Sequence, residues 1–223
     1  MPEDRISFRP VSEGDILFIK EMMNRTWEFD AYTQNTFTVD LILSNYLKSL
    51  LDRSNYGEMA ICNNGPVGFL FGRCDTVPGR NFEHLSCSGD VPDRTVNDIG
   101  WDVYRQDLMR IRDADDLLIK DKEDSFEGEL TLLMIDDSYR KNGIGRVLLN
   151  RFMRYLAKNN AKKAYLFTDD YCNFAFYSKI GFRQEDTTSI DLSDGNDRKF
   201  FLYSFHSDVF LQPAKRQSTE LRD

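Results

Sequence analysis

The fold is decided by residues 130–156, LTLLMIDDSYRKNGIGRVLLNRFMRYL, which join an apolar run, a polar turn, a glycine pair and an amphipathic stretch. The run Leu130–Ile135 is almost wholly apolar, which predicts a central strand covered on both faces. Behind the glycines, apolar residues recur at helical spacing at Val147, Leu148, Leu149, Phe152, Met153 and Leu156. The stretch therefore predicts a strand that leads into a helix with two glycines at its start.

Strand and helix signals extend from this stretch toward both ends of the chain. Upstream, the pattern predicts a strand at 6–8, a helix at 16–27 that follows Ser12 and Asp15, and a helix at 41–51 with Thr38 as its cap. It then predicts two strands, at 58–62 and 67–72, joined by a turn at 63–66. A loop at 74–98 and a helix at about 101–119 follow. Downstream, it predicts a strand at 164–168, a short helix at 174–179, and a hairpin of 190–192 with 200–205 around Asp194 and Gly195. Strands and helices are interleaved, so the predicted class is α/β.

Composition and charge limit the classes of function. The 223 residues are 41% apolar and 30% charged, as in globular proteins. The net charge of −8 repels polyanions, so we expect no nucleic-acid partner. No apolar run approaches the length of a membrane helix and the amino end lacks a signal-peptide core, so we expect a cytoplasmic protein without a membrane partner. The four cysteines form no C-x-x-C pair and predict neither a disulfide framework nor a zinc site.

The glycine pair Gly143 and Gly145 carries the strongest chemical signal. Glycines at a helix start let the backbone approach a ligand closely, and the free amides of the first turn favour an anion such as a phosphate or pyrophosphate. The segment is not a P-loop, and the third glycine of a dinucleotide fold is replaced by Leu148. Taken alone, the pair is equally compatible with an ordinary helix start.

Two motifs resemble the signatures of the GCN5-related N-acetyltransferase (GNAT) superfamily. The segment Arg140–Arg146 reads R-x-x-G-x-G behind an apolar strand and resembles the acetyl-CoA signature of that family. Residues 173–182, NFAFYSKIGF, are similar to its second signature, an N-x-x-A-x-x-x-Y-type helix that ends in G-F. The order of elements upstream also resembles the family, so the likeness covers most of residues 5–206. It implies a mixed, mostly antiparallel central sheet that is splayed around the cofactor, with flanking helices.

The resemblance also implies an activity, namely transfer of an acetyl group from acetyl-CoA to a primary amine by direct attack. The backbone of Leu133, Met134 and Ile135 matches the strand end that binds the pantetheine arm. The pyrophosphate cradle matches Arg140, Lys141, Asn142, Gly143, Ile144, Gly145 and Arg146, although Lys141 and Asn142 stand where the family often has Gly and Lys. Asn173 matches an asparagine that contacts the cofactor, and Tyr177 matches a cofactor-contacting tyrosine that protonates the leaving thiolate.

An alkyl amine is protonated near neutral pH and must lose a proton before it can attack a thioester. A carboxylate, directly or through water, is a suitable acceptor. Glu129 stands at the start of the central strand, where several family members keep a glutamate that serves as general base. Glu127 lies two residues earlier and would share its face if the strand starts early. The acceptor is therefore Glu129, Glu127 or water.

Other polar residues receive structural interpretations. Asp113, Asp115 and Asp116 lack the glycine and ligand spacing of a calcium loop and read as a solvated helix face. Asp169 and Asp170 read as an exposed turn, although a cleft could use them to attract an amine. Cys172 has no histidine near it in sequence, so we expect no acyl-cysteine. His84 and Cys87 form a lone H-x-x-C, and we expect no bound metal.

The expected organisation is a single acetyltransferase domain over residues 1–211, followed by a polar tail at 212–223. An insertion at about 81–128, with Trp101 and Tyr104, enters the strand directly before Glu129 and should shape the acceptor side. The acceptor is a small-molecule or peptide amine, and a homodimer is an expectation from the family. The alternative function is a catalytically weak or inactive CoA-binding domain that acts as a regulator or interaction module.

Overall fold

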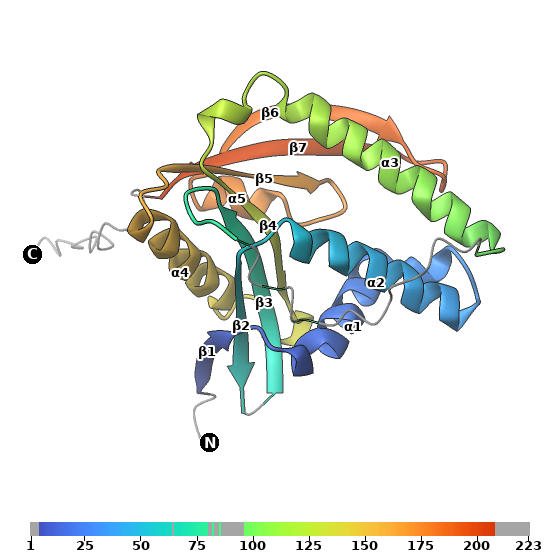
Figure 1. The fold of residues 1–223 in the computed structure, drawn as a ribbon, viewed down its shortest axis with the longest axis horizontal. Coiled ribbons are helices and arrows are strands. Elements are labelled where there is room, and N and C mark those ends of the chain that lie inside the picture. The colour runs from blue at the N-terminus through green and yellow to red at the C-terminus, as the bar shows by residue number, and fades with distance from the viewer. Residues whose placement is uncertain (1–4, 64, 80–81, 83–84, 86–95, 208–223) are drawn as a thin grey trace, which may run out of the picture.

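Seven strands form one open sheet in the computed structural model of the chain, which describes residues 5–63, 65–79, 82, 85 and 96–207 (Figure 1). Their order across the sheet is β1-β2-β3-β4-β5-β7-β6. All neighbours are antiparallel except β4 and β5, which run parallel. The strands are β1 (Ile6–Pro10), β2 (Tyr56–Cys62), β3 (Gly65–Cys74), β4 (Gly128–Ile135), β5 (Lys163–Asp169), β6 (Arg183–Asp191) and β7 (Asp197–His206). The predicted mixed, mostly antiparallel sheet is confirmed.

Helices connect these strands. The α-helices of the described ranges are α1 (Ile16–Trp27), α2 (Thr36–Asp52), α3 (Ile99–Ile119), α4 (Ile144–Lys158) and α5 (Ala175–Lys179). Short 3₁₀ turns lie at Glu13–Asp15, Phe29–Ala31, Glu123–Ser125 and Asp137–Tyr139. None of the helices that the structure describes is both long and apolar enough to cross a membrane.

The start of α2 differs from the prediction. Asn35, not Thr38, caps this helix: its side-chain oxygen accepts hydrogen bonds from the amides of Phe37 at 3.0 Å and Thr38 at 3.4 Å. The Thr38 hydroxyl instead donates to Asp98 at 2.8 Å. Asparagine is among the most favourable capping residues, and the partner that engages Thr38 is distant in sequence.

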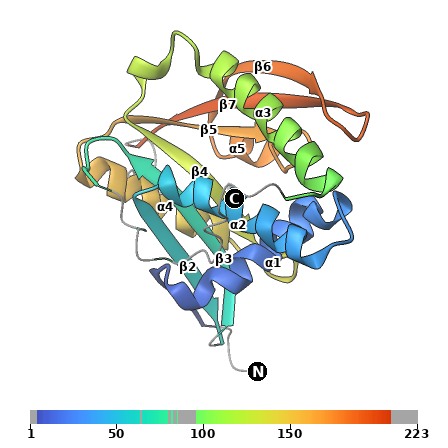
Figure 2. The same cartoon turned by 45° about the vertical axis from the view of Figure 1, so that its right-hand side comes forward.

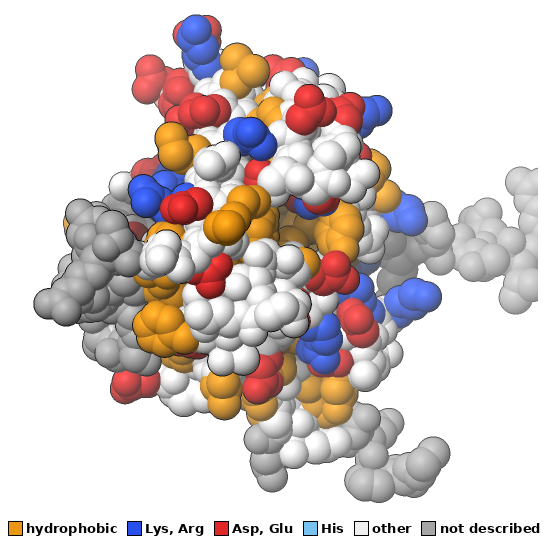
Figure 3. All heavy atoms as spheres, turned by 90° about the vertical axis from the view of Figure 1, so that its right-hand side faces the viewer, with side chains coloured by type: hydrophobic (Ala, Val, Ile, Leu, Met, Phe, Trp, Pro, Cys, Tyr) orange, Lys and Arg blue, Asp and Glu red, His pale blue; other side chains and the backbone are white. Residues whose placement is uncertain are grey.

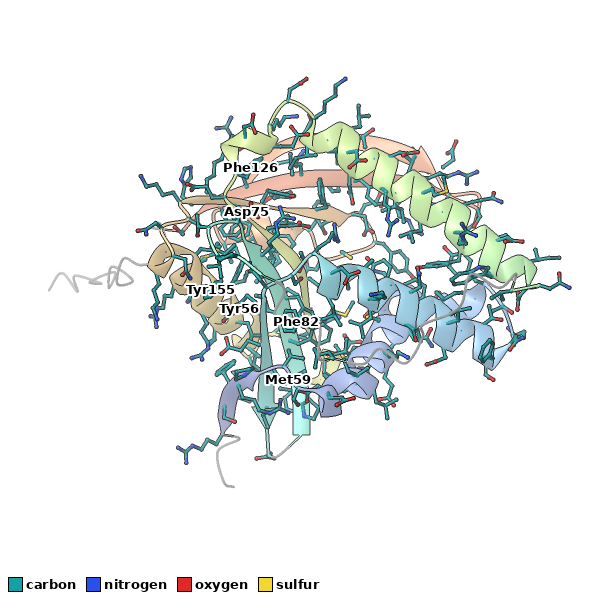
Figure 4. All side chains as sticks on the ribbon, viewed as in Figure 1. Tyr56, Met59, Asp75, Phe82, Phe126 and Tyr155 are labelled. Atoms are coloured by element: carbon teal, nitrogen blue, oxygen red, sulfur yellow. The ribbon has the colours of Figure 1, made fainter. Side chains whose placement is uncertain are left out.

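The helices cover the two faces of the sheet separately. On one face, α4 packs Leu148, Phe152 and Leu156 against β3, β4 and β5, whereas Val147 is exposed despite its helical spacing. On the other face, α1 and α2 cover β2–β4, and α3 covers β5–β7 (Figure 2). Figure 4 shows Tyr56 beside Tyr155 of α4, with ring centres 4.7 Å apart.

The parallel pair β4 and β5 separates almost at once. Glu129 and Tyr165 are their one aligned pair in the described ladder. Just beyond it, Thr131 is an extra residue in β4 relative to β3, because Phe71 pairs with Leu132 and Gly72 pairs with Leu130. A bulge of this kind bends its strand. Beyond it, the facing edges of β4 and β5 have no strand partner in the part of the chain that the structure describes.

Helix α3 lies in the segment that we expect to be an insertion. Its carboxyl-terminal half packs Leu118 and Ile119 with Tyr165 and Leu202 of the sheet. Near its amino end, the buried carboxylate of Asp107 accepts hydrogen bonds from the Tyr32 hydroxyl at 3.0 Å and the Ser193 amide at 3.0 Å. Asp107 thereby joins α3 to the α1–α2 connection and to the β6–β7 turn. Of the predicted loop at 74–98, residues 80–81, 83–84 and 86–95 lie outside the described residues, as does the whole predicted tail at 212–223.

Candidate active site

The amino end of α4 is uncapped and open. Gly143 precedes the helix with φ +79°, and no side chain caps this end. Within the described residues, nothing accepts a hydrogen bond from the amides of Ile144, Gly145 and Arg146. A Cβ atom built on Gly143 would have no neighbour within 4 Å, so the space above it is open. Free amides at the positive end of a helix dipole favour a negatively charged group here.

The residues that precede this helix form an exposed basic loop. Arg140 is held inside the loop: its Nε donates to the Ile135 carbonyl at 3.2 Å, and its guanidinium pairs with Asp137 at 2.7 Å. Lys141 and Asn142 are exposed, as is Arg146 in the first turn. The loop therefore adds positive charge around the free amides of α4.

The strand end that faces this loop offers unpaired backbone. Leu133 and Ile135 point their side chains toward α4, and Met134 points toward the α1–α2 face. Among the described residues, the edge of β4 that faces β5 has no strand partner here. A Cβ atom on Gly145 would lie 3.5 Å from the Ile135 side chain, so the edge runs directly to the start of α4. An extended ligand with an anionic group fits this path.

Glu129 is buried and fully engaged in ion pairs. Its carboxylate lies 3.0 Å from the Arg73 guanidinium and 3.4 Å from that of Arg53, and the Tyr165 hydroxyl donates to it at 3.3 Å. Burial, followed by the charge of Glu129, raises the pKa of Tyr165 to about 12, so this phenol stays protonated and keeps donating. Glu129 thus organises two arginines at the point where β4 and β5 part.

Glu127 has a different environment. Its carboxylate accepts hydrogen bonds from the backbone amides of Lys162 and Lys163 at the start of β5, and these bonds lower its pKa. The strand starts at Gly128, after Glu127. The Glu127 carboxylate is therefore bound to the backbone at the start of β5 and does not lie beside Glu129 on the strand.

Tyr177 and Asn173 lie at the other side of the opening. The Tyr177 ring stacks on Phe182 at 5.6 Å between ring centres and lies 6.0 Å from Tyr203. Burial raises the pKa of the Tyr177 hydroxyl above its usual value of 10, so the group is protonated at neutral pH and available to donate. Asn173 is exposed directly before α5. Cys172 carries a thiol whose pKa is raised to about 12 by burial and Asp169, which disfavours a nucleophilic role.

A cavity of about 970 Å³ lies between the α1–α2 connection, the amino half of α3, the β5–α5 loop and the β6–β7 turn. Its acidic lining faces a single arginine, Arg198, and consists of Glu28, Asp98, Asp107, Asp170, Asp194 and Asp197. The aromatic part of the lining is Trp27, Tyr32 and Tyr171. Figure 3 faces this side of the molecule and shows acidic side chains around a hollow with apolar walls. The predicted insertion thus supplies part of the lining through α3.

Asp115, which the sequence pattern placed on a solvated helix face, is partly buried in the structure. Asp113 and Asp116 are exposed, as predicted, but Oδ1 of Asp115 is buried and has no hydrogen-bond partner in the described part of the chain. Burial raises the pKa of Asp115 to about 8, against the opposing effect of Arg53. A signal was present in the sequence: Asp115 follows Ile111 by four residues and precedes Leu118 by three, and both pack on the sheet.

No cluster of three or more metal-ligating side chains occurs among residues 5–63, 65–79, 82, 85 and 96–207. His84 and Cys87 lie outside these residues.

Comparisons with known proteins agree with this geometry. Residues 97–182, which contain α3, β4, α4, β5 and α5, match the family model described as "Acetyltransferase (GNAT) family". This part of the chain therefore resembles a GNAT acetyltransferase domain. A search of curated protein sequences found no match.

Solved structures show the same fold. An N-acetyltransferase from Staphylococcus aureus Mu50 has a TM-score of 0.53 at 14% identity, over 91% of this chain and 99% of the other. The PaiA N-acetyltransferase from Thermoplasma acidophilum, solved with coenzyme A, has a TM-score of 0.50 at 15% identity, over 91% and 99%. An aminoglycoside 6'-N-acetyltransferase complexed with coenzyme A has a TM-score of 0.52 at 14% identity, over 90% of this chain and 97% of the other. At these identities the likeness concerns the fold.

Proposed function

We propose that this protein is an N-acetyltransferase that transfers an acetyl group from acetyl-CoA to a primary amine by direct attack. The observation that carries the proposal is the opening between β4 and β5, which leads along unpaired backbone to the free amides of α4. Acetyl-CoA matches both parts, because its pantetheine arm is an extended chain with amide groups and its pyrophosphate is an anion. Two of the structurally similar proteins are described as complexes with coenzyme A.

In this proposal, the backbone of Leu133, Met134 and Ile135 pairs with the pantetheine arm. The pyrophosphate lies on the amides of residues 143–146, within the loop that begins at Arg140. Asn173 and Tyr177 contact the cofactor from the side of β5. The Tyr177 hydroxyl donates its proton to the sulfur as the carbon–sulfur bond breaks, so that coenzyme A leaves as a thiol.

The lining of the acidic cavity supports a cationic acceptor. The lining has six carboxylates and one arginine, Arg198, which already lies over the Tyr171 ring. A lining with this excess of carboxylates attracts ammonium groups. An aminoglycoside acetyltransferase is among the similar structures, and aminoglycosides carry several amino groups. We therefore propose a small molecule with more than one amine as the substrate class, ahead of a peptide amine. The free cysteines of the described residues, Cys62, Cys74 and Cys172, support a cytoplasmic location.

The direct test follows thiol release from acetyl-CoA with a panel of monoamines, polyamines, aminosugars and peptide amino termini. We expect release with polycationic small molecules and a rate that falls as salt screens the acidic cavity. Coenzyme A binding without thiol release from any amine would instead support a regulatory CoA-binding domain.

Replacing Gly143 with Val tests the pyrophosphate position. The new side chain enters the open space above the α4 amides, so we expect calorimetry to show coenzyme A affinity lowered about 100-fold, as for one or two lost charge-assisted hydrogen bonds. Gly195→Val is the matched control, because Gly195 has φ +78° and equally open space but lies in the β6–β7 turn. Both variants should lose similar stability through backbone strain. Unchanged affinity in Gly143→Val would remove the pyrophosphate from this helix.

A further inference from the structure

The starting observation is the orientation of Asp115 on α3. Ile111 and Leu118 place the inward face of this helix against Tyr165 and Phe167 of β5. Asp115 shares that face, and its Oδ1 is buried without a donor within the described residues. A buried carboxylate oxygen without a hydrogen bond is costly unless a cation or proton joins it. A proton on the carboxyl group, or a cation that enters beside α3, would therefore supply the partner that the described residues do not.

The charges around Asp115 come from several elements. Arg53, directly after α2, attracts Asp115, and Tyr46 of α2 interacts with it electrostatically. Glu129 of β4, Asp169 at the end of β5 and Asp116 of α3 repel it. Arg53 is shared, because it already lies 3.4 Å from Glu129. The interior group contains the carboxylates of Asp115, Glu129 and Asp169 against the guanidiniums of Arg53 and Arg73. Asp75, which pairs with Arg73 at 2.6 Å, and Asp116 add further negative charge, so the group attracts a cation.

The two glutamates predicted as proton acceptors are already occupied. Glu129 has guanidiniums on both oxygens and the Tyr165 hydroxyl on one of them. Glu127 binds backbone amides at the start of β5. Asp115 differs from both because its Oδ1 accepts no hydrogen bond from any described residue.

We propose that Asp115 binds the ammonium group of the acceptor and takes its proton, while Glu129 holds Arg53 in position beside it. This inference rests on the proposed acetyltransferase function. An N–H bond of the ammonium breaks and an O–H bond forms on Asp115, which leaves a neutral amine with a free electron pair. The amine attacks the thioester carbonyl, the carbon–sulfur bond breaks, and the sulfur receives a proton from Tyr177. The nitrogen releases its second proton through solvent, which restores the tyrosine, and Asp115 returns its proton to solvent.

The electrostatics support this role. With a pKa of about 8, Asp115 is a stronger base than an ordinary aspartate and is partly deprotonated near neutral pH. The approach of a cationic amine favours the deprotonated form further. Asp115 therefore becomes able to accept a proton as the substrate arrives.

The test compares Asp115→Asn with Asp113→Asn, an exposed carboxylate two residues away on the same helix. We expect kcat/KM of the wild type to rise with pH up to about 8. In Asp115→Asn this rise should be absent, and kcat/KM should be lower by about 10²–10³-fold at pH 7. The deficit should shrink toward pH 9.5, where more of the amine is already neutral. Asp113→Asn should match the wild type, and coenzyme A affinity should be unchanged in both variants.

Outcomes separate the two proposals. If the wild type releases no thiol with any amine, the proposed acetyltransferase function is wrong, and so is the proposed role of Asp115. If the wild type is active and Asp115→Asn keeps its rate and its pH profile, only the role of Asp115 is wrong. A loss of equal size at pH 7 and pH 9.5 also overturns proton transfer, because it indicates a contribution to shape alone.

Thermal unfolding provides a readout that needs no substrate. The pKa of Asp115 is raised on folding, from its ordinary value of 3.8 to about 8, so the folded state binds the proton more tightly than the unfolded chain. The stability from this group is complete below pH 4 and is lost as pH rises to about 8. Asparagine does not titrate, so the Tm of Asp115→Asn relative to wild type should increase by several degrees between pH 4 and pH 8. A constant difference would show that Asp115 is not buried as a carboxyl group.

Discussion

Tyr177→Phe should lower turnover about 10²–10⁴-fold and leave coenzyme A affinity almost unchanged. The substitution removes only the hydroxyl, while the ring keeps its stacking on Phe182 and its contact with Tyr203. General acid assistance to a leaving group is worth about 10²–10⁴ in rate. Because burial keeps this hydroxyl protonated at neutral pH, the wild type can donate throughout the physiological range.

Single-turnover measurement of thiol release is the appropriate assay, because it reports the chemical step rather than product release. Tyr155→Phe is a matched control: Tyr155 is also a half-buried tyrosine packed on an aromatic ring, but it lies on α4 against Tyr56. The control should retain the wild-type rate. An equal rate in Tyr177→Phe would leave this tyrosine with a packing role.

Glu129→Gln should lose both stability and activity. The variant leaves Arg53 and Arg73 beside a neutral amide, and removal of one partner from a buried pair costs about 3–5 kcal/mol. Both arginines are partly exposed, at 44% and 31% of their side chains, so we expect about 2–3 kcal/mol in denaturant unfolding. Activity should fall because Arg53 is no longer held beside Asp115.

The pH dependence distinguishes this positioning role from proton transfer. The rate deficit of Glu129→Gln should be the same at pH 7 and pH 9.5, in contrast to that of Asp115→Asn. Glu58→Gln is the matched control, since Glu58 is also buried and ion-paired, with Arg151, on the strand β2. It should lose stability without losing rate. A deficit in Glu129→Gln that disappears at high pH would return the proton-acceptor role to Glu129.

Local patterns in the sequence were sufficient for the elements themselves. The apolar run at residues 130–135, the helical spacing from Leu148 to Leu156 and the Asp194-Gly195 turn each depend on neighbours within a few positions. The open helix start at Gly143 was predictable for the same reason, because backbone freedom and unpaired amides are properties of the local chain. These features indicated the fold class and the path for an extended anionic ligand.

The interior of the site depended on residues that are distant in sequence. Asp113, Asp115 and Asp116 are alike as local sequence, and only the packing of α3 on β5 buries one of them. Glu129 obtained its two arginines from the residue that follows α2 and from β3, and Glu127 was engaged by the start of β5. The parting of β4 and β5 required the bulge at Thr131, which is defined by the register with β3. The sequence by itself therefore determined most of the strands and helices and the glycine-led start of α4, but it indicated only the end of β6 (Arg183–Asp191). Only the tertiary structure decided which carboxylates lose water and which cation each one meets, because desolvation and charge pairing depend on distances across the fold.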